Sequence, residues 1–246
     1  MLNKRDFLLR CLDIYFDVYF WMPCMGFLHP KVAYQEVQVN LASRSNVVMI
    51  ADFADMKLVL QNMTFHPIKG AAVCGLAAFI LYPGKQGQAM GDRCFGAVEA
   101  HVFGSINTFT EDSFFVTCMN TLFQLLSGNY AKVWVCMGFL HRQMTGLRAN
   151  WLRPDDARPF VHLEALRRLA WHVFYLDRLL ADGYDEYISC RSDHMRIHLP
   201  CRSESFLENK LVETEWLLDK PVIGSPNLGI HGWQIRIIDL RHRILV

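Results

Sequence analysis

Four residues whose side chains can bind a metal ion lie close together near residue 195. Cys190, His194, His198 and Cys201 are separated by three, three and two residues. Cysteine thiolates and histidine nitrogens are ligands of tetrahedral zinc, and four of them would close a structural site. Only half of the spacing usual in zinc fingers is present, and Pro200 restricts the backbone next to Cys201. We therefore favour four independent loop residues, with a zinc site as the alternative.

Charged residues near position 170 suggest a second kind of chemistry. Asp177 and Arg178 follow Glu164, Arg167 and Arg168, and such a set could line a catalytic cleft. Ion pairs on a helix surface or a buried structural pair explain the same residues more simply. The sequence contains no nucleophile elbow, phosphate-binding loop, dinucleotide-binding turn or zinc-protease helix. We therefore predict no enzymatic activity and no catalytic or cofactor-binding residue in this chain.

Basic residues cluster near the C-terminal end, where Arg236, Arg241, His242 and Arg243 could contact a nucleic acid. Asp239 interrupts the cluster, so a solvated helix face is the interpretation that we favour. The formal net charge is only +1. A domain that binds nucleic acid by itself usually has a clear basic excess, because phosphate neutralisation supplies much of its affinity.

The composition is typical of a domain with a large core. Hydrophobic residues make up 52% of the 246 residues, and the eight cysteines form no Cys-x2-Cys pair, as expected for buried free thiols. The longest uninterrupted apolar run, residues 71–82, is shorter than the roughly 20 residues that span a membrane. We expect no membrane span, and we expect most tryptophans to pack in the core.

The periodicity of the apolar residues predicts helices and little else. The ranges with helical spacing are 7–22, 70–82, 88–106, 114–126, 130–144, 163–180, 204–218 and 230–244. Residues 31–61 are weakly patterned, and the loop 184–202 has no helical period. Helices joined by short to medium loops predict an all-α fold, an irregular multi-helix domain.

Three stretches resemble one family. Residues 9–17 with the turn Phe27-Leu28-His29-Pro30 resemble the start of the middle homology region of fungal zinc-cluster transcription factors. Residues 164–178, EALRRLAWHVFYLDR, are similar to the signature helix of that family, although Leu166 replaces an arginine. Residues 192–201 resemble the loop that follows the helix and ends in Leu-Pro.

The resemblance implies an all-helical regulatory domain over residues 1–246, truncated at both ends, in a nuclear transcription factor. It assigns structural roles to Glu164, Arg167, Arg168, Trp171, Asp177, Arg178, Leu199 and Pro200. DNA binding and zinc in this family belong to an N-terminal six-cysteine cluster, and no such motif occurs in this sequence. The resemblance suggests a second copy of the chain or the transcription machinery as partners. The alternative function is a helical metabolite-binding protein or an enzyme of an unrelated family. We expect Arg168 or Asp177 to form an ion pair inside the domain.

Overall fold

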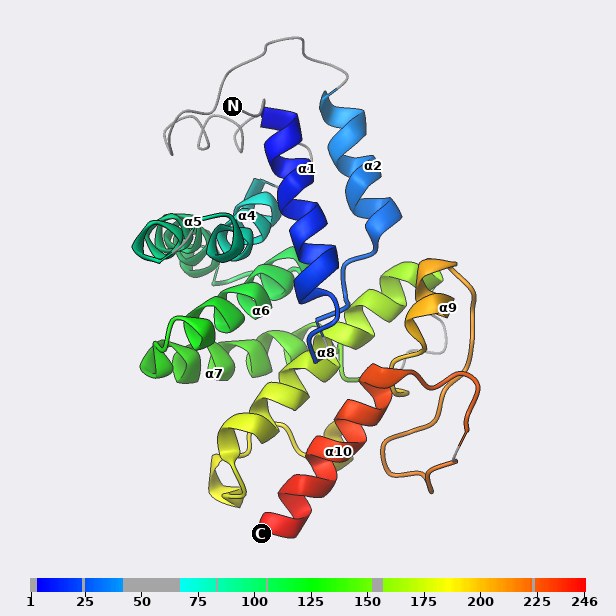
Figure 1. Cartoon of the computed structure of the whole chain (residues 1–246). Helices are drawn as coiled ribbons and strands as arrows, with labels where there is room; N and C mark the ends of the chain where they lie inside the picture. Colours follow the sequence, from blue (N-terminus) through cyan, green and yellow to red (C-terminus); the bar gives the residue numbers. More distant parts are fainter. Residues whose placement is uncertain are drawn as a thin grey trace. The chain divides into compact units, whose positions relative to one another are not determined.

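A computed structural model describes residues 4–23, 25–41, 67–82, 84–104, 106–151, 157–222 and 224–246. These residues form helices connected by loops and isolated backbone bridges, with no sheet among them, so the predicted all-α fold is confirmed (Figure 1). The chain divides into two compact units. The first unit is Met1–Tyr19 with Pro30–Cys136, and the second unit is Phe20–His29 with Met137–Val246. Among the described helices, none is long and apolar enough to cross a bilayer.

The first unit contains the helices from the N-terminal half of the chain. They are α1 (Lys4–Ile14), which continues as a π-helical turn (Tyr15–Tyr19), then α2 (Pro30–Leu41), α4 (Pro67–Leu81), α5 (Lys85–Gly104), α6 (Glu111–Leu126) and the first residues of α7 (Tyr130–Gly146). In α4 every residue from Ala71 to Ala78 is buried, which confirms a central helix that is apolar on all sides. Phe123 of α6 lies between Phe95 and Phe79, with ring centroids 4.4 and 5.3 Å away.

Two glycines on α5 have opposite surroundings. A Cβ atom on Gly91 would lie 2.3 Å from Cε2 of Phe123, whereas a Cβ atom on Gly96 would have no atom within 4 Å. Glycine weakens a helix by roughly 1 kcal/mol relative to alanine. At Gly91 the missing side chain permits α5 and α6 to approach closely. Helix α5 forms over Lys85–Gly104 despite its glycines.

Side chains cap the N-terminus of α6. Thr110 and Ser113 form a capping box, in which each side chain accepts a hydrogen bond from the backbone amide of the other residue. Such a cap satisfies amides that have no partner inside the helix. The helix ends at Leu126, before Gly128, which has a φ of +74°.

The second unit is built on two long helices. They are α8 (Phe160–Ala181) and α10 (Ile230–Leu245), which run side by side in the same direction (Figure 1). Between them lie two 3-10 turns (Asp185–Tyr187 and Ser192–His194) and the short helix α9 (Ser203–Leu207). Asp182 and Gly183 end α8 with φ angles of +48° and +95°, the left-handed conformation usual at a helix C-terminus.

Two expectations about the elements were wrong. Helix α2 (Pro30–Leu41) occupies the start of the stretch that we expected to be weakly patterned. Pro30 is its first residue, and Ala33 and Val37 are buried. The helix expected over 204–218 ends at Leu207. The following residues instead extend along the loop, where the amide of Leu199 donates to the carbonyl of Glu215 over 2.8 Å. The rest of the weakly patterned stretch, residues 42–61, lies outside the described residues.

The environment of the tryptophans and of the C-terminal basic cluster also differs from the prediction. Trp171 is fully buried, whereas Trp134 and Trp151 are about half exposed. In the basic cluster, Arg236 and His242 are buried rather than solvated. Helical spacing identifies a face, but it does not say which face the rest of the unit covers.

Candidate functional site

The buried face of α8 carries charge. The carboxylate of Glu164 is 0% exposed, and the guanidinium-bearing side chain of Arg168 is 1% exposed. Trp171, Asp177 and Arg178 are also buried. Charged groups are almost never fully buried unless they are paired. The ion-pair and hydrogen-bond partners of these residues therefore indicate their role.

The Arg168 guanidinium is surrounded by partners. Its Nε donates to Glu164 Oε1 over 2.9 Å, its Nη1 to the carbonyl of Gly26 over 2.7 Å, and its Nη2 to the carbonyl of Cys201 over 2.9 Å. The guanidinium also lies 4.3 Å above the ring of Phe206. We call this arrangement the Arg168 cluster. It confirms the predicted internal ion pair.

Glu164 completes the Arg168 cluster. Its Oε1 also accepts the amide of Cys201 over 2.9 Å, and its Oε2 lies 2.9 Å from Nη1 of Arg167. One carboxylate thus faces two arginines and one backbone amide. Arg168 also donates hydrogen bonds to two backbone carbonyls. The cluster therefore meets the requirement that a buried charge be both paired and hydrogen-bonded.

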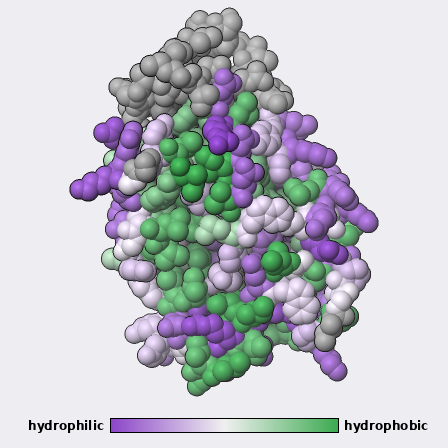
Figure 2. Space-filling model, in the orientation of Figure 1, coloured by the Kyte–Doolittle hydropathy of each residue, from purple (hydrophilic) through white to green (hydrophobic). Residues whose placement is uncertain are grey.

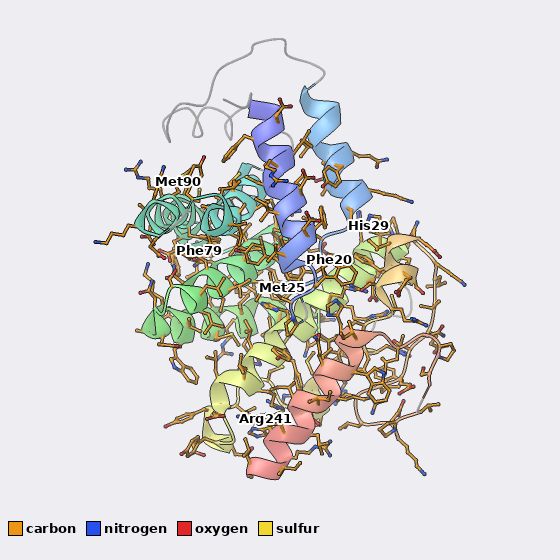
Figure 3. The ribbon with its side chains drawn as sticks, in the orientation of Figure 1. Phe20, Met25, His29, Phe79, Met90 and Arg241 are labelled. Carbon is orange, nitrogen blue, oxygen red and sulfur yellow. The ribbon has the colours of Figure 1, made fainter. Side chains whose placement is uncertain are left out.

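The turn at residues 27–30 packs on the same cluster. Phe27 lies edge-on to His172 of α8 at 5.8 Å between ring centroids, and His29 lies edge-on to Phe206 of α9 at 5.0 Å. Figure 3 labels Met25 and His29 on this segment, with His29 beside α9. Gly26 has little room for a side chain, since a Cβ atom there would lie 3.0 Å from Arg168 Nη1.

Side chains of α8 hold the following loop through hydrogen bonds to its backbone. Asp177 accepts the amide of Ser189 over 3.1 Å and that of Cys190 over 3.0 Å, and it pairs with Arg178 Nη1 at 3.1 Å. Trp171 Nε1 donates to the carbonyl of His198 over 2.8 Å. Burial raises the pKa of Asp177, while the two amides and the Arg178 charge act in the opposite direction. Asp177 therefore acts as an anchor for backbone amides.

Arg178 extends this arrangement to α10. Its Nη2 donates to Ser192 Oγ over 3.1 Å, and Ser192 Oγ donates to Asp239 Oδ1 over 2.7 Å. Arg243 reaches the other oxygen of Asp239 at 3.1 Å. These contacts join α8, the loop and α10 through side chains that the sequence did not associate with one another. Of these contacts, only the pair of Asp239 with Arg243 had a local signal in the sequence, namely the spacing of four residues on one helix.

The four zinc candidates lie in separate environments. Cys190 is buried, with its Sγ 3.4 Å from Sδ of Met195, whereas the side chain of His194 is exposed. His198 is buried against Trp216, and its Nδ1 contacts the carbonyl of Thr214. Burial raises the pKa of Cys201 to about 12, which disfavours the thiolate that binds metals. Within the described ranges, no three residues of the ligating types are grouped so that they could hold a metal ion.

Leu199 and Pro200 are buried and directly precede Cys201, whose carbonyl and amide bond to Arg168 and Glu164. The amide of Leu199 is bonded to Glu215, and its carbonyl accepts a hydrogen bond from the hydroxyl of Thr214. The resemblance assigns structural roles to both residues, and their position in the unit agrees with such roles.

Two buried histidines near α8 are held neutral. Burial lowers the pKa of His172 to about 4, partly offset by a hydrogen bond to the backbone of Pro23. Burial likewise lowers the pKa of His231 to about 4, helped by the positive charge of Arg168. Protonation of either imidazole would therefore favour unfolding.

An open groove of about 510 Å³ lies at the junction of the loop with α10. Charged residues line it, but they are paired with one another: Arg191 with Asp193, His242 with Asp185, and Arg243 with Asp239. The volume is within the range of small-molecule sites, although most of those are more apolar.

Compared with protein-family models, curated proteins and solved structures, the chain gives no match. The geometry of the second unit and the resemblance of the three stretches are therefore the grounds for a function.

Proposed function

We propose that this chain is the regulatory domain of a fungal zinc-cluster transcription factor and acts in DNA-templated transcription in the nucleus. It would reach DNA only through a zinc cluster that is not among its own residues, and zinc would belong to that cluster. Homodimerisation or contacts with the transcription machinery would transmit its effect. Since its charged signature residues hold backbone in place, we propose a non-enzymatic role.

One observation carries the proposal. The turn at 27–30, the helix at 164–178 and the loop at 192–201 contact one another: Phe27 packs against His172, and Cys201 accepts a hydrogen bond from Arg168 and donates one to Glu164. Apart from residues 9–17 and Pro30, which belong to the first unit, the residues on which the resemblance rests lie in the second unit. A chance similarity of three short stretches would not require their residues to contact one another.

A reporter experiment tests this function. The full chain is fused to a DNA-binding domain of unrelated origin and expressed in a fungal cell with a reporter gene under the matching site. The expected result is reporter expression that differs by about threefold or more from the DNA-binding domain alone. Equal expression, with both fusions present in the nucleus at similar amounts, would contradict the proposal.

A matched pair of variants makes the experiment specific. Arg168→Ala removes the centre of the Arg168 cluster, whereas Arg191→Ala removes an exposed arginine of the same unit. We expect the first variant to lose the reporter effect and the second to keep it. Equal loss in both would mean that the effect does not depend on the folded second unit.

A helical metabolite-binding protein of an unrelated family is the second candidate, and the open groove is the observation that favours it. Because its lining is charged with both signs, a zwitterionic small molecule such as an amino acid would suit it. Thermal unfolding of the chain in the presence of a panel of amino acids tests this candidate, since a ligand of the folded state raises the melting temperature.

A further inference from the structure

Helix α10 buries Ile235 and Ile238 but exposes a second stripe of apolar side chains. Ile237, Leu240 and Ile244 are 62%, 50% and 73% exposed, while Arg236 and Asp239 on the other face are buried. Figure 2 shows hydrophobic surface along the course of α10. An ordinary surface helix has one apolar stripe, which faces the core, so the exposed stripe of α10 is additional to its buried isoleucines.

Polar contacts hold α10 in this orientation. Arg236 donates to Glu215 Oε2 over 2.7 Å and to the carbonyls of Leu217, Trp216 and Asp219 over 3.0 to 3.3 Å. Asp239 accepts from Ser192. Rotating the helix to bury its apolar stripe would break all of these bonds and would leave buried polar groups without partners. The exposed stripe is therefore a fixed feature of the second unit.

The spacing of the stripe is that of a coiled-coil seam. Isoleucine recurs every seven residues at 230, 237 and 244, and Trp233 and Leu240 occupy the position three residues after each of the first two. In heptad notation the isoleucines are at a and the other two residues at d. A β-branched residue at a with leucine at d favours a parallel pair of helices over higher assemblies.

Charge does not oppose the approach of a second identical seam. The arginines that flank the stripe are already paired within the chain: Arg236 with Glu215, Arg241 with Asp182, and Arg243 with Asp239. Two copies can therefore meet without bringing unpaired like charges together. Figure 3 labels Arg241 on α10.

We propose that α10 is a homodimerisation helix, whose seam from Ile230 to Ile244 packs in parallel against the same seam of a second copy. The seam covers two heptads, fewer residues than the 20 to 30 per side of a standard interface. We therefore expect a weak dimer that forms reversibly with concentration. The inference rests on the proposed function in that it locates on α10 the homodimer named there; sedimentation needs no reporter gene, so a missing dimer and a missing regulatory effect are told apart.

Sedimentation velocity of the full chain at about 1 to 200 µM tests the dimer. The mean mass of the wild-type chain should rise toward that of two chains across this range. The double variant Ile237→Glu, Ile244→Glu should weaken association by about 100-fold or more, because a symmetric interface contains each substitution twice. Leu211→Glu, at a position 80% exposed outside α10, is the matched control and should associate like the wild type.

Circular dichroism separates a lost dimer from a lost fold. All three substituted side chains are exposed, so each variant should keep the helical signal of the wild-type chain. A wild-type chain that stays monomeric over the whole range would overturn the proposal. A folded double variant that dimerises as well as the wild type would overturn it too.

Cross-linking tests the parallel arrangement. In a parallel pair each a position faces its own copy, so Ile230→Cys, Ile237→Cys and Ile244→Cys should each be cross-linked by a short bismaleimide. The seven described native cysteines are buried, and the wild-type chain treated with the same reagent is the control. Cross-linking at 237 but not at 230 or 244 would indicate an antiparallel pair and contradict the proposed arrangement.

Discussion

Replacing Glu164 by glutamine tests the Arg168 cluster most directly. Glutamine has the same shape and keeps one oxygen for Arg168 Nε and for the amide of Cys201. It removes the negative charge, and its amide nitrogen would face either Arg167 or Arg168. Breaking a buried ion pair on one side costs about 3 to 5 kcal/mol, because the partner charge stays buried without compensation.

The assays are urea unfolding and thermal unfolding of the full chain, both followed by tryptophan fluorescence. Five of the six tryptophans belong to the second unit, and Trp134→Phe removes the one in the first unit. At roughly 2 to 4 °C per kcal/mol for a chain of this size, the melting temperature should fall by about 6 to 20 °C. Glu204→Gln is the matched control: its carboxylate is 71% exposed and pairs with Arg202 at 3.6 Å, so its loss should cost less than about 0.5 kcal/mol.

A double variant separates the ion pair from the packing around it. Adding Arg168→Met to Glu164→Gln should restore part of the lost stability, because no uncompensated charge then remains at that position. If Glu164→Gln stays within about 0.5 kcal/mol of the wild-type chain, the charges of this cluster do not hold the unit together, and our explanation of the signature helix is wrong.

Four further outcomes are expected. Asp177→Ala should lower the free energy of unfolding of the second unit by about 2 to 4 kcal/mol, because two backbone amides lose their acceptor; an unchanged melting temperature would contradict this. His172 and His231 have folded pKa values of about 4, below the unfolded value of about 6.5, so they stabilise the fold fully above pH 6.5 and progressively less as the pH falls toward 4. At pH 5 the loss should be about 2 kcal/mol for each, and His172→Leu should remove about half of this pH dependence, as pH-dependent urea titrations would reveal. Gly91→Ala should destabilise the first unit by about 1 to 3 kcal/mol, whereas Gly96→Ala on the same helix should stabilise it by up to about 1 kcal/mol; equal effects in thermal unfolding would refute the close approach at Gly91. Elemental analysis of the undenatured chain should find much less than one zinc per chain, and a stoichiometric amount would show that the loop with the candidate ligands rearranges.

Much of the fold follows from local patterns in the sequence. The uninterrupted apolar run at 71–82 predicts α4, and the helical spacing of residues 114–126 predicts α6. Both features depend on neighbours along the chain, which the sequence displays. Helix α2 and the extended residues after Leu207 were mispredicted, since their conformation depends on contacts with distant segments.

The candidate site was predictable only in part. The sequence, through its resemblance to a family, identified the residues of the signature helix and an internal ion pair. It did not indicate that Gly26 and Cys201 offer their carbonyls to Arg168, because a backbone carbonyl carries no sequence signal. Similarly, the candidate zinc ligands are evenly spaced in sequence, but the 3-10 turn and the extended backbone place their side chains in different surroundings.

Helix α10 has one property that the sequence predicts and one that only the tertiary structure determines. By itself the sequence determined that residues 230–244 form a helix with one apolar stripe, because periodicity is a property of the chain. Only the tertiary structure decided that this stripe faces outward. Buried Arg236 bonds to residues 215–219 of the loop before α10, and buried Asp239 bonds to Ser192 and pairs with Arg178 and Arg243. The penalty for leaving these groups unpaired outweighs the gain from burying Ile237 and Ile244.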